Sequence, residues 1–180
     1  MSRIRRETKE TTITAEVRPG TGVSDVRISD RFLAHMVETL ARYASLDIEI
    51  EAEGDLRHHL VEDVAIVLGQ ALKEATPDGI ERFGASIIPM DEALVQAAID
   101  VGGRPYYVGK LPSKLYTHFL HSFATNLGAT LHVRVLRGSD RHHVVEAAVK
   151  ATGMALRQAL APRDDVFSTK GAVRTDEATD

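Results

Sequence analysis

Hydrophobic and polar positions alternate along this chain with two different periods. Two segments have the two-residue period of a half-buried strand, LDIEIEAEG at 46–54 and ATLHVRVLRG at 129–138. Two others have the spacing of amphipathic helices, RFLAHMVETLARYA at 31–44 and LYTHFLHSFATNLG at 115–128. Each of these helices directly precedes one of the strands, so the pattern predicts a helix–strand pair in each half of the chain.

The same order continues on both sides of these pairs. Strand-like segments come before each helix: ETTITAEVRPG and VSDVRIS in the first half, EALVQAAIDVG and RPYYVGKL in the second. A further apolar-periodic helix follows each strand, and a link at 76–90 joins the halves. We therefore expect an α+β fold, a tandem pseudo-twofold repeat of a β-β-α-β-α unit with the sheet covered by helices on one side.

The final helix of each half begins with the same HHxxE motif, which shows that the chain is a repeat. An offset of 142 − 58 = 84 aligns RHHLVE with RHHVVE, and Gly69 with Gly153. The predicted organisation is a first half over 1–88, a second half over 89–171 and a flexible tail over 172–180. A half of about 85 residues has a thin core, so the halves are expected to pack into one compact unit.

Composition excludes several classes of protein and of site. The chain has no cysteine, which rules out disulfides and thiolate metal sites. It has no run of roughly 20 apolar residues and no secretory signal, so a cytoplasmic protein without a membrane partner is expected. The net charge is −4, the basic residues are scattered and tryptophan is absent, so nucleic acid is not an expected partner.

The two HHxxE motifs carry the chemistry. On a helix, His58 and Glu62 lie on one face, while His59 points about 100° away, so two adjacent histidines face different ions. One such pair is commonly a surface feature, but two copies in a repeat, with a histidine inside each preceding helix, favour metal binding. Imidazole and carboxylate suit Mn, Fe, Co, Ni or Zn. The candidate ligands are His35, His58, His59, Glu62, His118, His142, His143 and Glu146. His121 and His132 lack counterparts in the first half and are expected to lie outside the set.

The order of the motifs is similar to that of the imidazoleglycerol-phosphate dehydratase family. The resemblance runs from about Thr8 to Gly171 through TKETTI, FLAHM, HHLVED, GIERFG, PMDEAL, GGRPYY, THFLHSFA, HHVVEA and STKG. It implies a hydro-lyase of histidine biosynthesis that converts imidazole glycerol phosphate to imidazole acetol phosphate, with the substrate ring coordinated by two Mn ions. It also implies a large octahedral, 24-mer-like homo-oligomer with metal sites built between subunits.

The resemblance further implies a role for individual residues. The eight candidate ligands match the family's metal-binding positions. Glu10 matches the acidic residue of the KET motif, the implied general base. The implied phosphate-binding residues are Arg82, Arg104, Ser168 and Lys170.

This chain departs from the family around the first HHxxE motif. Arg57 stands where the family has an Asp pair, in a stretch about three residues shorter, and Ala34 replaces an aspartate. These changes leave three interpretations: an active divergent dehydratase, a paralogous lyase or isomerase acting on a related phosphorylated metabolite, or a non-catalytic metal-stabilised oligomer. Retention of Glu10 and of the phosphate-binding set argues against the third, because a structural metal site needs neither.

Overall fold

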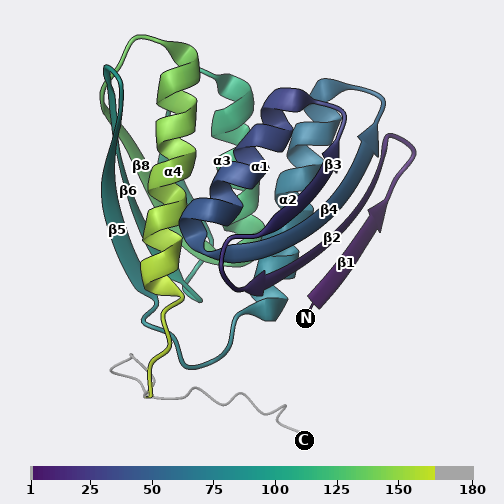
Figure 1. The fold of residues 1–180 in the computed structure, drawn as a ribbon, viewed down its shortest axis with the longest axis horizontal. Helices are drawn as coiled ribbons and strands as arrows, with labels where there is room; N and C mark the ends of the chain where they lie inside the picture. The colour runs from purple at the N-terminus through teal and green to yellow at the C-terminus, as the bar shows by residue number, and fades with distance from the viewer. Residues whose placement is uncertain (1, 165–180) are drawn as a thin grey trace, which may run out of the picture.

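A computed structural model describes residues 2–164 of the chain. Over this range it contains four helices and two four-stranded sheets (Figure 1). The helices are α1 (Arg31–Ala44), α2 (Arg57–Ala75), α3 (Lys114–Leu127) and α4 (Arg141–Ala159). The first sheet contains β1 (Ser2–Glu7), β2 (Thr11–Pro19), β3 (Ser24–Ile28) and β4 (Leu46–Gly54). The second contains β5 (Phe83–Met90), β6 (Ala93–Val101), β7 (Tyr106–Gly109) and β8 (Ala129–Arg137). The tail predicted over 172–180 lies outside the described residues.

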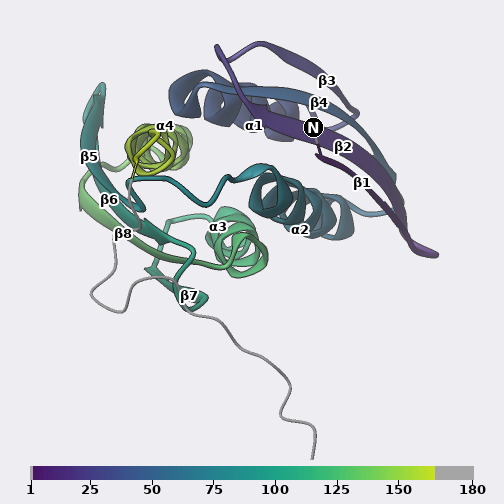
Figure 2. The ribbon, with the colours of Figure 1, turned by 90° about the horizontal axis from the view of Figure 1, so that it is seen from below.

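The sheets form the two outer layers and the helices lie between them (Figure 2). Strands β2 and β6 alternate strictly between buried and more exposed positions. Ile13, Ala15 and Val17, for example, face the helices and are almost fully buried. Each sheet is therefore covered by helices on one side, as the period-two pattern predicts.

The two halves have the same topology, which confirms the predicted repeat. The strand orders are β1-β2-β4-β3 and β5-β6-β8-β7. In the first sheet β4 runs antiparallel to β2 and parallel to β3, and α1 connects β3 to β4. In the second sheet β8 runs antiparallel to β6 and parallel to β7, and α3 connects β7 to β8. The predicted β-β-α-β-α order is present in both halves, preceded in each by one additional strand, β1 or β5.

The link expected at 76–90 is shorter than predicted. Residues 83–90 form β5, which pairs antiparallel with β6 from Phe83↔Asp100 to Met90↔Ala93. The adjacent Ile87 and Ile88 and the following Pro89 hide the strand period in the sequence. As an edge strand, β5 is only half-buried, so burial leaves a weak signal in its composition.

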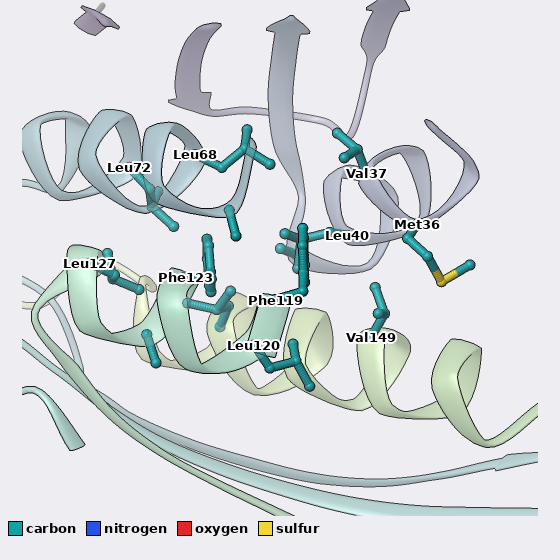
Figure 3. Close-up of a cluster of buried hydrophobic side chains, with 14 of the residues drawn as sticks. Met36, Val37, Leu40, Leu68, Leu72, Phe119, Leu120, Phe123, Leu127 and Val149 are labelled. Atoms are coloured by element: carbon teal, nitrogen blue, oxygen red, sulfur yellow. The ribbon is translucent and has the colours of Figure 1, made fainter. Parts of the chain in front are cut away.

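Helix packing closes the core between the sheets. The side chains in Figure 3 come from all four helices, with Phe119 and Phe123 of α3 almost fully buried among them. Two glycines at equivalent positions let the helices approach. A Cβ on Gly69 of α2 would lie 2.6 Å from the carbonyl oxygen of Phe123, and one on Gly153 of α4 would lie 2.8 Å from the Cβ of Tyr43.

All four helices begin at the same end of the molecule. At this end His58 of α2 lies beside His118 of α3. At the opposite end, the backbone N–H of Arg82 bonds to the carbonyl of Ala159, the last residue of α4. The fold thus collects the helix N-terminal turns, which carry the predicted metal ligands. None of the described helices is long and apolar enough to cross a membrane.

Candidate metal centre

The first group of predicted ligands joins α2 to α3. His118 Nε2 lies 3.0 Å from Glu62 Oε1, and His58 Nε2 lies 3.7 Å from Glu62 Oε2. The rings of His58 and His118 are stacked, with centroids 5.8 Å apart. Although it is close to the carboxylate, the buried Nε2 of His118 makes no hydrogen bond of regular geometry within the described chain. We call His58, Glu62 and His118 the first triplet.

The second triplet, His35, His142 and Glu146, joins α1 to α4. Glu146 Oε2 lies 3.3 Å from His35 Nε2 and 3.1 Å from His142 Nε2. The other oxygen, Oε1, lies 2.8 Å from Lys150 Nζ. Burial alone would raise the pKa of Glu146, but the hydrogen bonds and charges of Lys150 and His35 lower it below its usual value. The carboxylate is therefore ionised at neutral pH.

Each triplet combines the two halves of the chain. His35 belongs to the first half, yet it faces Glu146 of the second, and His118 of the second half faces Glu62 of the first. This exchange follows from the packing of α1 on α4 and of α2 on α3. The sequence repeat shows that these residues are equivalent but not which partners they meet.

The second histidine of each HHxxE motif points away from its triplet. Their carboxylate neighbours lie outside the triplets: Asp55 and Glu10 for His59, and Asp91 and Glu92 for His143. The hydrogen bond of His59 to Asp55 raises the pKa of His59, and the hydrogen bond to Glu92 does the same for His143. The predicted divergence of the paired histidines is present.

The eight predicted ligands therefore do not meet at one point in a single chain. Among residues 2–164, no three His, Asp or Glu side chains already surround a common point as they would around a bound ion. The donor set nevertheless fits a divalent transition metal, because imidazole and carboxylate groups are its usual ligands. The buried Nε2 of His118, which makes no hydrogen bond of regular geometry among the described residues, is the kind of electron-pair donor that such an ion would satisfy.

Glu10 lies beside the first HHxxE motif, at the turn between β1 and β2. Its carboxylate is 54% exposed and lies 3.6 Å from Nδ1 of His59. The turn is held by its backbone: the N–H of Glu10 donates to the hydroxyl of Thr8, and the N–H of Asp55 donates to the carbonyl of Glu10. The predicted base is therefore next to a predicted ligand.

The predicted phosphate-binding arginines lie at the other end of the molecule. Arg82 donates to both carboxylate oxygens of Asp100, at 2.9 and 3.2 Å. Arg104 is exposed in the turn between β6 and β7. Ala159, which bonds to Arg82, is 159 − 142 = 17 residues from His142 along α4, or about 25 Å. Ser168 and Lys170 lie outside the described residues.

Three charged residues contact the site but were not predicted from the sequence. Asp55 and Lys150 could have been found from local spacing, since each lies four residues from its partner on a helix or at its start, His59 and Glu146 respectively. Glu92 contacts His143 across 51 residues and leaves no local signal. His121 and His132 lie outside both triplets, next to the rings of two tyrosines.

Comparison with known proteins identifies the family to which this chain is similar. The family model for imidazoleglycerol-phosphate dehydratase matches residues 29–156. The imidazoleglycerol-phosphate dehydratases of Clostridium botulinum (strain Hall) and Rhodococcus opacus (strain B4) are 43% and 44% identical, each over 96% of this chain and 98% of the relative. The crystal structure of the Pyrococcus furiosus enzyme in complex with (S)-C348 has a TM-score of 0.85 at 41% identity, covering 94% of this chain and 100% of that one. The crystal structure of imidazoleglycerol-phosphate dehydratase from Staphylococcus aureus has a TM-score of 0.79 at 30% identity, covering 90% of this chain and 99% of that one.

The fold, the site and these relatives define the chain as a hydro-lyase, an enzyme that removes water from its substrate. More particularly, the chain belongs to the imidazoleglycerol-phosphate dehydratase family, whose activity serves histidine biosynthesis. The family and the enzyme class predicted from the sequence are confirmed.

Proposed function

We propose that this chain dehydrates imidazole glycerol phosphate to imidazole acetol phosphate at a site that holds two divalent metal ions, with manganese the expected metal. The observation that carries the proposal is the pair of His–Glu–His triplets, with Glu10 beside the first HHxxE motif. Bound there, the metal would supply Lewis-acid stabilisation of a deprotonated imidazole ring.

The second histidines complete the proposed metal sites from neighbouring copies. Each triplet offers three donors, and an ion of this type accepts up to six ligands, which leaves positions for the substrate and for another histidine. His59 and His143 contact carboxylates outside the triplets of their own chain. They are therefore suited to triplets on adjacent subunits, which supports the expected octahedral, 24-mer-like homo-oligomer.

Glu10 is proposed to take the carbon-bound proton of the substrate. Its exposed carboxylate is accessible to a ligand, and the turn that carries it is fixed by backbone hydrogen bonds. The proton on Glu10 and the hydroxyl group that leaves the neighbouring carbon together make up the water that is lost. The resulting enol rearranges to the ketone.

The substrate phosphate is proposed to bind Arg82 and Arg104, together with Ser168 and Lys170. Guanidinium groups suit bidentate contact with phosphate oxygens, and a lysine adds a point charge. Because Arg82 lies about 25 Å along α4 from His142, one chain does not supply both the triplets and these arginines to a small substrate. The phosphate-binding residues of each site would come from another copy.

The test is a reconstitution assay. The purified protein is stripped with a chelator, reloaded with Mn²⁺ and given imidazole glycerol phosphate while formation of the ketone is followed. We expect turnover that a chelator abolishes and that Glu62→Gln lacks, whereas the matched control Glu53→Gln, an exposed position on β4, retains it. Absence of turnover in protein shown to contain manganese would contradict the proposal and favour a paralogous lyase or isomerase.

A further inference from the structure

Glu10 and Glu92 occupy equivalent places in the two halves of the fold. Glu10 directly precedes β2, which begins at Thr11, and Glu92 directly precedes β6, which begins at Ala93. The two strands are equivalent, because β2 pairs with β1 as β6 pairs with β5. Each glutamate also lies beside the second histidine of the HHxxE motif in its half. The pseudo-twofold relation therefore gives these two carboxylates the same location relative to the ligands.

Their surroundings are nevertheless different. Glu92 Oε2 lies 2.7 Å from Nδ1 of His143, while its Oε1 accepts the backbone N–H groups of Ser139 and Asp140 at 3.1 and 2.7 Å. Glu92 is thus held by three donors. A carboxylate held in this way is a poor proton acceptor.

Glu10 has no comparable set of partners. Among the described residues, its carboxylate contacts only Nδ1 of His59, at 3.6 Å, which is longer than a hydrogen bond. Glu10 is also the more exposed of the two, at 54% against 40% for Glu92. Of the two equivalent carboxylates, only Glu10 can change its partners without breaking existing hydrogen bonds.

The difference traces to one position in the repeat. Asp55 lies four residues before His59, and its Oδ1 is 2.9 Å from Nδ1 of that ring. The same carboxylate oxygen accepts the backbone N–H of Leu56 at 2.6 Å, which fixes its place at the start of α2. At the offset of 84 the second half has Ser139, which carries no carboxylate. In that half Glu92 fills the role instead.

We propose that Asp55 is a positioning residue that holds Nδ1 of His59 and so leaves the carboxylate of Glu10 free to act as a base; this rests on the proposed function. When the proton of the imidazole ring is on Nδ1, the lone pair of Nε2 is free to bind a metal ion. A carboxylate that accepts a hydrogen bond from Nδ1–H commonly fixes this tautomer. Without Asp55, the Nδ1–H group would be satisfied by Glu10, which is already only 3.6 Å away.

The test variant is Asp55→Ser, which gives the first half the residue of the second. We expect kcat to fall at least about tenfold, with KM changed by less than about twofold. Asp55→Asn retains an oxygen that accepts from Nδ1–H and should restore most of the activity. Glu53→Ser, which removes an exposed carboxylate two positions away, serves as the matched control and should behave like the parent. Equal loss in the Asn and Ser variants would overturn the proposal.

Two further measurements do not depend on the reaction. Manganese binding, followed by the resonance signal of the free ion, should be retained in Asp55→Ser, because a ring held by Glu10 still offers Nε2. A crystal structure of that variant should show the Glu10 carboxylate within about 3 Å of His59 Nδ1. If Glu10 stays where it is in the parent, the inference is wrong even where the dehydratase activity is confirmed. If instead the parent lacks that activity, only the proposed function fails, and the position of Glu10 still tests the competition.

Discussion

A histidine can offer a lone pair from one ring nitrogen only when the other nitrogen carries the proton. In this chain the first and second histidines of the HHxxE motifs face carboxylates through different ring nitrogens. Nε2 of His142 faces Glu146 within its triplet, whereas Nδ1 of His59 and of His143 faces a carboxylate outside the triplets. The identity of the donor atoms is therefore set by single side chains placed around each ring.

Replacing Glu10 by glutamine tests its role as the base. Glutamine keeps the size and an oxygen of the side chain but cannot take a proton, so turnover should fall by at least about a hundredfold. Manganese content and assembly should not change, because Glu10 lies outside both triplets. The measurements are the kinetic assay, metal analysis and light scattering on the same preparation. An assembly that dissolves in this variant would make Glu10 a structural residue.

Asp47 provides a pH prediction away from the site. The backbone N–H of Thr21 is the largest influence that lowers its pKa; that of Val23 and the side chain of Arg18 add to it. Because the pKa of Asp47 is lower in the folded state than in the unfolded state, its ionised carboxylate stabilises the fold at pH values above the unfolded-state pKa. This stability is lost as the pH falls through the folded-state pKa. Asp47→Asn should therefore lower the melting temperature at neutral pH, and the difference should shrink below about pH 4.

Thermal melts across this pH range measure the effect. The control is Asp25→Asn, whose carboxylate contacts Arg27 in an exposed pair and should contribute little. A difference between parent and Asp47→Asn that does not vary with pH would show that the amide disturbs the turn for another reason.

At the scale of elements, the helices must approach closely enough to bring ligands from two halves into one triplet. Gly69 and Gly153, identical in the repeat, lie where α2 meets α3 and α4 meets α1. A Cβ at either place would press on the backbone or Cβ of the neighbouring helix, which cannot move as a flexible side chain can. The same close contacts that fill the core therefore set the geometry of the triplets.

Gly69→Ala and Gly153→Ala should destabilise the fold, although alanine favours a helix by about 1 kcal/mol. Overpacking a tight contact costs about 1–3 kcal/mol, and the loss should be larger for Gly69, where the added carbon meets a carbonyl oxygen at 2.6 Å. Chemical denaturation at fixed protein concentration measures the difference. Arg157→Ala, at an exposed position of α4, should stay within about 0.5 kcal/mol of the parent. Increased stability in both glycine variants would show that the helices can separate at little cost.

The helices and strands also show which parts of the fold can be predicted from the sequence. Periodicity predicted the four helices and most strands, because each buries one regular face. It missed β1 and β5, edge strands in which hydrophobic and polar residues do not alternate clearly along the sequence. The spacing within the HHxxE motifs predicted which residues could be ligands and that His58 and His59 diverge. The pairing of His35 with Glu146 depends on how α1 packs on α4, and the contact of Glu92 with His143 joins distant segments, so neither follows from local patterns.

At the scale of the whole molecule, the candidate ligands and the candidate phosphate-binding arginines lie at opposite ends. All four helices run in the same direction, so their N-terminal turns carry the triplets, while Arg82 lies beside the last residue of α4. A substrate as small as a phosphorylated imidazole cannot span this distance. Under the proposed function, the assembly is therefore part of the site as well as a source of stability.

Mixed oligomers test this arrangement. Glu62→Gln removes a triplet carboxylate and Arg104→Ala removes an arginine at the other end, so each variant alone should lose at least about 90% of its activity. Co-assembled in equal amounts, the two variants should recover roughly a quarter of the parent activity, the chance that a site draws both contributions from intact copies. Differently tagged chains confirm that mixing has occurred. Mixed assemblies as inactive as either variant would indicate that both contributions come from one chain.

The exchange of ligands between the halves also has a consequence for the ancestry of the chain. Neither half contains a complete triplet. Each half provides a His–Glu pair to one triplet and a single histidine to the other triplet. Two copies of the first half alone, packed as these halves are, would set His35 of each copy against Glu62 of the other and form two identical triplets. A self-pairing protein of half this length could thus have carried the same set of ligands. Fusion of its two copies into one chain would then have allowed Asp55 and Ser139 to diverge, which identical copies cannot do.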